Sequence, residues 1–226
     1  MRFFFEKIKN IRNYSGKFLL IIALSFVVGI SFSIASDDTQ LTQSISGSLD
    51  IGIVDAGGST VSSPTAVFAA KAFSMTYQTA TATLGVSSER MRVTNPSGSD
   101  DTWALNVAAT SGETSVWTTG SVTYDYNDST ASAGDGADTD SVGGQMTIDP
   151  SAGTIAGVGG TSISNVSLGT SDAFVESSVS SIDLMTAATG SQKPGQWDLT
   201  GVGLSQTIPA AQASGSYTLN LTLTAS

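Results

Sequence analysis

The sequence predicts an all-β protein, a β-sandwich with Greek-key or immunoglobulin-like order, that follows an N-terminal secretory signal. Three observations support this prediction. The chain begins with a basic segment and then an apolar one. The remainder is rich in Ser, Thr, Gly and Val and poor in Lys and Glu, a composition that disfavours long helices. Its apolar residues alternate with polar ones in short runs between turn-forming clusters, which is the pattern of half-buried strands.

The signal segment consists of a basic part, an apolar part and a pair of small residues. Residues 1–17 carry five basic residues and one acid, and the apolar run Phe18–Phe32 follows. Ser33 and Ala35 come next, so we expect a signal peptide over residues 1–35 that is cut after Ala35. A retained membrane anchor is the alternative, but a bilayer span needs about 20 apolar residues and this run is shorter. We therefore expect a secreted, extracellular protein.

Residues 36–226 are expected to form a single domain, because a β-sandwich can reach 191 residues without dividing. There is no Cys, so packing alone must hold this domain together. It contains 4 basic and 18 acidic residues, a net charge of −14. This charge disfavours nucleic acid and anionic membrane as partners and favours cations such as Ca²⁺. It also keeps an exported protein soluble.

Alternation predicts strands along this whole domain, each with its large apolar side chains on one face. The expected strands are Gln43–Asp55, Ala72–Leu84, Glu89–Asn95, a strand that begins at Trp103, Ser121–Tyr126 and Gly215–Ser226. In the second of these, Phe73, Met75 and Tyr77 lie on one face. In the third, Met91 and Val93 are expected to point inward. Only Ser63–Phe73 has a composition that allows a helical turn.

An acidic segment interrupts the strand pattern over residues 125–145. It holds aspartates among Gly, Ala and Ser and almost no apolar residues, so we expect a loop insertion. The candidate metal ligands in it are Asp128, Asp135, Asp138 and Asp140. Carboxylate oxygens are the ligands that Ca²⁺ prefers, although the spacing is not that of an EF-hand. A calcium site and a solvated acidic loop therefore both stay open, and Ca²⁺ is the only cofactor considered.

The residue types argue against catalysis. The chain contains no His and no Cys, which removes the usual general base, thiol nucleophile and imidazole ligand. Lys71 and Lys193 do not follow a serine at the spacing that Ser-x-x-Lys hydrolases need, and no Gly-x-Ser-x-Gly motif occurs. Nothing in the spacing of the acids selects a carboxylate pair for glycoside hydrolysis. We expect a non-enzymatic protein without catalytic residues.

A Trp-x-Leu motif occurs twice, as Trp103 with Leu105 and as Trp197 with Leu199. Residues two apart on a strand lie on the same face, so each motif can supply a large buried area to one core. Core packing is therefore the simplest explanation of both motifs.

The order of motifs around the first Trp-x-Leu resembles that of the WxL-domain family of bacterial cell-surface proteins, over roughly Phe73–Ser226. The residues that carry the resemblance are Val93, Thr94, Asn95, Trp103, Leu105, Pro209, Gly215 and Tyr217. The family has its second Trp-x-Leu in the last strand, where this chain has Leu221-Thr222-Leu223. The resemblance implies a β-sandwich that is held non-covalently on the cell wall, with peptidoglycan as ligand. It gives Trp103, Leu105, Trp197 and Leu199 either a structural or a wall-binding role.

Two other functions stay open at this point. A self-assembling extracellular fibre or pilus subunit would use the first strand after the signal, within Gln40–Asp55, to complete the sheet of a neighbour. A carbohydrate-binding module would need exposed aromatic side chains, for which Trp117, Tyr124 and Tyr126 are the candidates.

Overall fold

The computed structural model describes residues 43–45, 47–97, 102–128 and 143–226. The chain divides into two units, Met1–Ser44 and Ile45–Ser226, and the described strands all belong to the second. Its described part is built from antiparallel strands and three short 3₁₀ turns. The prediction of an all-β sandwich is confirmed.

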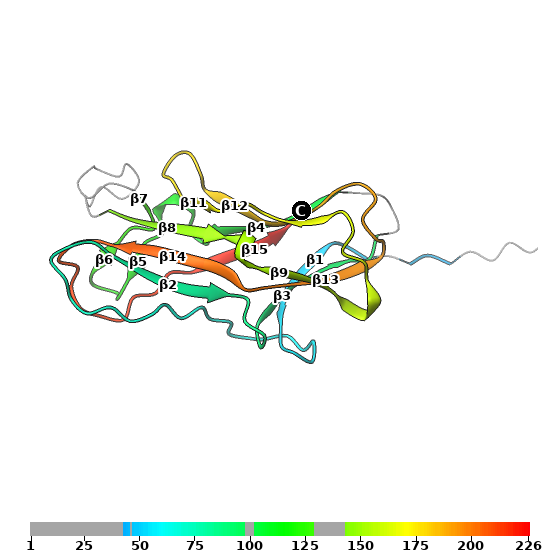
Figure 1. Ribbon diagram of the computed structural model, residues 1–226, viewed down its shortest axis with the longest axis horizontal. Coiled ribbons are helices and arrows are strands. Elements are labelled where there is room, and N and C mark those ends of the chain that lie inside the picture. The colour runs from blue at the N-terminus through cyan, green and yellow to red at the C-terminus, as the bar shows by residue number, and fades with distance from the viewer. Residues whose placement is uncertain (1–42, 46, 98–101, 129–142) are drawn as a thin grey trace, which may run out of the picture. The chain divides into compact units, whose positions relative to one another are not determined.

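One layer of the sandwich is formed by two sheets, which are connected where β13 of one continues into β14 of the other (Figure 1). Their strand orders are β1-β3-β13-β9 and β11-β8-β14-β2, with β7 paired to β8. The strands are β1 Asp50–Val54, β2 Gln78–Leu84, β3 Arg90–Asn95, β7 Asn127–Asp128, β8 Gly144–Asp149, β9 Thr154–Gly157, β11 Asp172–Ala173, β13 Gly195–Thr200 and β14 Val202–Ile208. Only Gly201 separates β13 from β14, and its φ of 79° lies in the left-handed region that glycine tolerates best. The chain therefore passes from one sheet into the other at this residue.

The second layer is one sheet with the order β10-β12-β4-β15. Its strands are β4 Trp103–Ala109, β10 Val166–Leu168, β12 Ser181–Ala187 and β15 Leu221–Ala225. A register shift between Asp183 and Met185 lets the neighbouring residues Leu184 and Met185 both become buried. A small hairpin of β5 (Trp117–Thr118) and β6 (Thr123–Tyr124) completes the described strands.

The core lies between the two layers and follows the predicted alternation. Alternate residues of β4 from Trp103 to Ala109 are buried, and their neighbours are half-buried. Met91 and Val93 of β3 are fully buried, as expected. Inward side chains of β8, β12, β13 and β14 complete the cluster. The hydrophobic alternation of the sequence thus fixes which face of each long strand packs inward.

The segment between β1 and β2 differs from the prediction. The expected strand Ala72–Leu84 begins only at Gln78, and Phe73, Met75 and Tyr77 are 61%, 73% and 42% exposed. Ser63–Phe73, whose composition allows a helical turn, contains none. No strand forms before Gln78 because this connection has only isolated backbone hydrogen bonds and no continuous ladder to a neighbouring strand. One of these bonds joins the Ala69 N–H to the Thr81 carbonyl at 3.0 Å.

The first strand is shorter than predicted. Pairing with β3 begins at Asp50, which lies opposite Thr94, and Pro96 follows soon after on the partner side. Proline has no N–H to donate to a ladder, so pairing cannot continue past it. Upstream of β1, Ile45 is 88% exposed.

Candidate functional site

The structure brings the two Trp-x-Leu motifs together in the core. Trp103 and Leu105 come from β4 and Trp197 and Leu199 from β13, which lie in opposite layers. All four are buried, and the ring centroids of Trp103 and Trp197 are 5.1 Å apart with a tilt of 45°. The Trp197 indole N–H donates to the Ser162 carbonyl at 2.9 Å. This geometry fits a structural role for the motifs, because a buried indole has no face left for a wall polymer.

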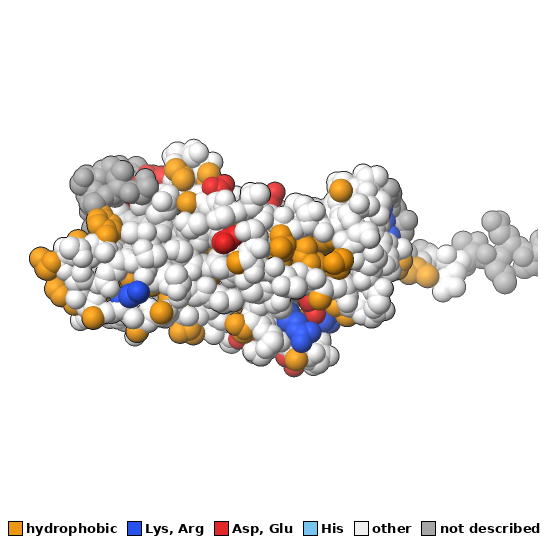
Figure 2. Space-filling view, in the orientation of Figure 1, with side chains coloured by type: hydrophobic (Ala, Val, Ile, Leu, Met, Phe, Trp, Pro, Cys, Tyr) orange, Lys and Arg blue, Asp and Glu red, His pale blue; other side chains and the backbone are white. Residues whose placement is uncertain are grey.

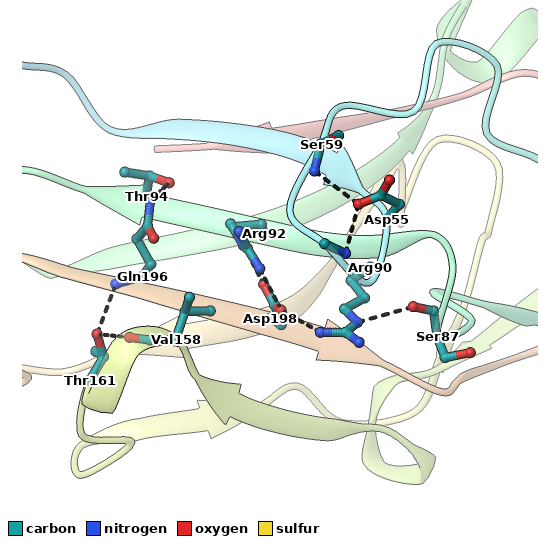
Figure 3. Close-up of polar contacts among 11 residues, drawn as sticks. Asp55, Ser59, Ser87, Arg90, Arg92, Thr94, Val158, Thr161, Gln196 and Asp198 are labelled. Carbon is teal, nitrogen blue, oxygen red and sulfur yellow. Dashed lines mark hydrogen bonds and ion pairs between the residues drawn. The ribbon is translucent and has the colours of Figure 1, made fainter.

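A polar cluster lies on the outer face of β3 and β13, on the side away from these tryptophans (Figure 3). We call it the arginine face and define it by Arg90, Arg92, Thr94, Gln196 and Asp198. Arg92 lies opposite Asp198 in the register, and Thr94 lies opposite Gln196. Cross-strand neighbours on one face are close enough for their side chains to bond. The face is therefore a direct product of the strand register.

Asp198 is the centre of the arginine face. Asp198 is 4% exposed. Its two carboxylate oxygens accept hydrogen bonds from the Nε and Nη2 of Arg92 at 2.6 and 2.9 Å. This is the bidentate geometry that makes guanidinium–carboxylate pairs strong. Arg90 adds a longer contact from its Nη1 at 3.4 Å. Beside these, the Gln196 amide donates to the Thr94 hydroxyl at 3.2 Å.

The charges of this cluster stabilise one another. Burial alone would raise the pKa of Asp198, but hydrogen bonds and charge from Arg92 and Arg90 outweigh it and hold that pKa below its ordinary value. The same hydrogen bond raises the pKa of Arg92. Arg92 and Asp198 are therefore both ionised at neutral pH, and the arginine face holds two basic side chains and one acidic side chain on a domain whose net charge is −14.

The two arginines differ in their access to solvent. The side chain of Arg92 is 15% exposed, whereas that of Arg90 is 30% exposed. The Nε of Arg90 donates to the Ser87 carbonyl at 3.1 Å, which orients the guanidinium without covering it. Figure 2 shows basic and acidic side chains gathered over β3. Arg90 is thus the member of the cluster that can donate to a carboxylate or phosphate outside the protein.

The alternation of residues in the sequence already places these charged side chains on the outer faces of their strands, which composition alone does not show. Arg90 and Arg92 flank the inward residue Met91, so they must share the outward face of their strand. Asp198 stands between Trp197 and Leu199, which both point inward, and must point outward as well. What the alternation could not tell is that these two strands are neighbours in the sheet.

The three aromatic candidates for sugar stacking are not on the surface. Trp117, Tyr124 and Tyr126 are 9%, 5% and 0% exposed, so the expectation that they are exposed is wrong. Trp117 stacks on Tyr124 at 6.0 Å, and its indole N–H donates to the buried amide oxygen of Gln206 at 2.9 Å. Burial, with a smaller contribution from nearby carboxylates, raises the pKa of Tyr126 to about 12. These side chains build core rather than a ligand platform.

The acidic candidates for calcium are only partly within the described residues. Asp128 lies in β7 and is 8% exposed, whereas Asp135, Asp138 and Asp140 fall in 129–142, outside the part that the structure describes. Among the described residues, no three acidic side chains are grouped so as to hold a metal ion.

Calcium binding by residues 125–145 therefore stays a prediction with a direct test. If the loop binds Ca²⁺ in the folded state only, the midpoint of thermal unfolding will rise as the ion is titrated to millimolar concentration. A chain with Asp135, Asp138 and Asp140 replaced by asparagine will show no such rise. If the midpoint of the unaltered protein does not change, residues 125–145 are a solvated acidic loop that binds no Ca²⁺.

The chain matches none of the family models, curated proteins or solved structures with which it was compared. Across the described ranges, no helix has both the length and the apolar character that a membrane span requires. Function is therefore argued from the geometry of the site and not from a relative.

Proposed function

We propose that this protein is an exported, non-enzymatic cell-surface protein that associates non-covalently with the bacterial cell wall, where it serves in adhesion. We further propose that its contact with the wall polymer is made through the arginine face and not through the Trp-x-Leu motifs. The observation that supports this most is the half-exposed Arg90 guanidinium, held in place on the outer face of a sheet in an otherwise acidic domain.

The chemistry of the wall suits this face. Peptidoglycan offers carboxylates on its peptides and hydroxyl and amide groups on its sugars. A guanidinium binds carboxylates through charge-assisted hydrogen bonds, and its planar shape allows two of them at once. Thr94 and Gln196, both half-buried on the same face, add a hydroxyl and an amide that can exchange their mutual bond for bonds to sugar groups. The buried Asp198 repels an anionic ligand only weakly, because Arg92 already neutralises the Asp198 carboxylate.

Sedimentation with purified cell walls tests this proposal. At a concentration low enough for the chain alone to stay in the supernatant, the processed chain, residues 36–226, is expected to pellet when purified walls are added. Arg90→Gln is expected to weaken the association about 10- to 150-fold, since a hydrogen bond to a charged group contributes about 1.5–3 kcal/mol.

Lys71→Gln supplies the matched control, because it removes the same charge from an exposed residue outside the arginine face. It should leave the association nearly unchanged. Equal losses in the two variants would mean that only net charge matters. Full binding by Arg90→Gln would place the contact on another surface.

A further inference from the structure

The last strand of the sandwich has one unpaired edge. The Ser226 carbonyl accepts a hydrogen bond from Ala104 of β4, and the Asn220 carbonyl accepts one from Thr110, just after β4. Thr218 exchanges two hydrogen bonds with Thr118. Even-numbered residues of this strand therefore direct their backbone groups toward β4 and β5, and odd-numbered residues direct theirs the other way. On that other side, the N–H and C=O groups of Leu221, Leu223 and Ala225 have no partner among the described residues.

An apolar groove runs along this open edge. Its volume is about 320 Å³, and its lining includes Ile53 of β1, Phe68 of the β1–β2 connection, Leu219 and Leu221. Core side chains of three further strands also line it, namely Val107, Met146 and Leu204. Leu219, Leu221 and Leu223 are only half-buried, although they point toward the core. The sandwich is thus incompletely covered where its last strand ends the sheet.

An unpaired strand edge beside an apolar groove is the arrangement that accepts an added strand. The backbone groups of the edge supply hydrogen bonds to any extended chain, and the groove selects apolar side chains at alternate positions of that chain. The occupant must therefore be an extended segment with apolar residues two or four positions apart, and with few charges between them.

We propose that this groove binds residues 39–45 of a second copy of this chain as an added strand. Leu41 and Ile45 are four positions apart, so they would point into the groove together with Gln43 between them. Thr42 and Ser44 would point to solvent. In the described part of this segment, Gln43–Ile45, no strand pairing is present, and Ile45 is 88% exposed. The segment thus has an apolar pattern, and its described part, residues 43–45, pairs with no strand of its own sandwich.

The direction of β1 favours a neighbour's groove over the chain's own. Ile53, which lines the groove, pairs with Met91, whereas Asp50 pairs with Thr94 and Gly47 lies against Pro96. The chain upstream of β1 therefore runs away from the groove along β3. A segment that leaves one copy and enters the groove of the next makes a head-to-tail contact, which generates a fibre wherever the rotation between copies does not close a ring.

Matched variants of the donor segment test this inference. The processed chain, residues 36–226, should form oligomers that grow with concentration in size-exclusion chromatography with light scattering, in the absence of cell walls. Leu41→Asp with Ile45→Asp should weaken this assembly by at least about 100-fold, because two apolar side chains lose their burial. Thr42→Asp with Ser44→Asp adds the same charge on the opposite face and should still assemble.

A synthetic peptide of residues 36–47 tests the groove separately. It should bind one-to-one to the Leu41→Asp, Ile45→Asp chain, which keeps an intact groove, and it should block assembly of the unaltered chain. Both variants should keep the far-UV circular dichroism of the parent, because the substituted residues lie outside every described strand.

Two results would overturn the inference. A chain that stays monomeric at every concentration, with no peptide bound by the donor variant, would remove the groove as an acceptor. If the unaltered chain is monomeric and does not bind the peptide, whereas the Leu41→Asp, Ile45→Asp chain does bind it, then each chain fills its own groove. Neither result bears on the proposed wall contact, which is measured by pelleting with walls and depends on Arg90.

Discussion

Trp197→Ala is expected to lower the free energy of unfolding by about 3–5 kcal/mol, the usual cost of removing a buried large aromatic side chain. Trp197 is fully buried, packs against Trp103 at 5.1 Å and donates its indole N–H to Ser162. The substitution removes the contact that joins the two layers at the Trp-x-Leu motifs. The cavity is expected to stay open, because both neighbouring strands of β13 hold its backbone in register.

Urea unfolding followed by circular dichroism measures this effect. Phe73→Ala, a large apolar residue that is 61% exposed, is the matched control and should change stability by less than about 0.5 kcal/mol. A double-mutant cycle with Trp103→Ala should give a coupling of about 0.5–1.5 kcal/mol for the ring pair. A loss below about 1 kcal/mol in Trp197→Ala would contradict a structural role for the motifs.

Asp198→Ala is expected to be the second most damaging substitution, at about 2–3 kcal/mol. Removing one partner of a buried ion pair typically costs about 3–5 kcal/mol, and the 15% exposure of the Arg92 side chain lowers that figure. The change leaves two guanidinium groups side by side without the carboxylate that neutralises them. Replacing both partners, as Asp198→Leu with Arg92→Met, should recover most of the lost stability, since the charge that remains on the face, Arg90, is 30% exposed and is hydrated.

The pH dependence of unfolding provides an independent test of the same pair. The pKa of Asp198 is lowered in the folded state, so the unfolded chain takes up its proton first as the pH falls. The pair therefore stabilises the fold fully above the unfolded-state pKa of about 3.9. This contribution disappears as the pH falls through the lower folded-state pKa. Asp198→Asn should lose stability at neutral pH and show a weaker decline below pH 4 than the parent chain.

Sequence pattern was a reliable guide wherever a strand has one face in the core. The alternation of Met91 with Val93 and of Trp103 with Leu105 identified inward side chains, and these are buried. The same reasoning failed for Phe73, Met75 and Tyr77, because alternation says nothing about whether a partner strand is available to pair. Trp117, Tyr124 and Tyr126, the candidates for exposed sugar-stacking side chains, are buried instead, because residue type alone does not tell which aromatic side chains the core of a sandwich takes up.

The sequence by itself determined the all-β class and the inward face of the long strands. It also determined the acidic charge of the domain and the lack of His and Cys. These properties follow from residue type and from neighbours along the chain. Only the tertiary structure decided that Trp103 meets Trp197, that Arg92 meets Asp198, and that β15 ends its sheet beside an open groove. Those facts depend on which strands become neighbours, and that choice is made by the packing of two whole layers around one core.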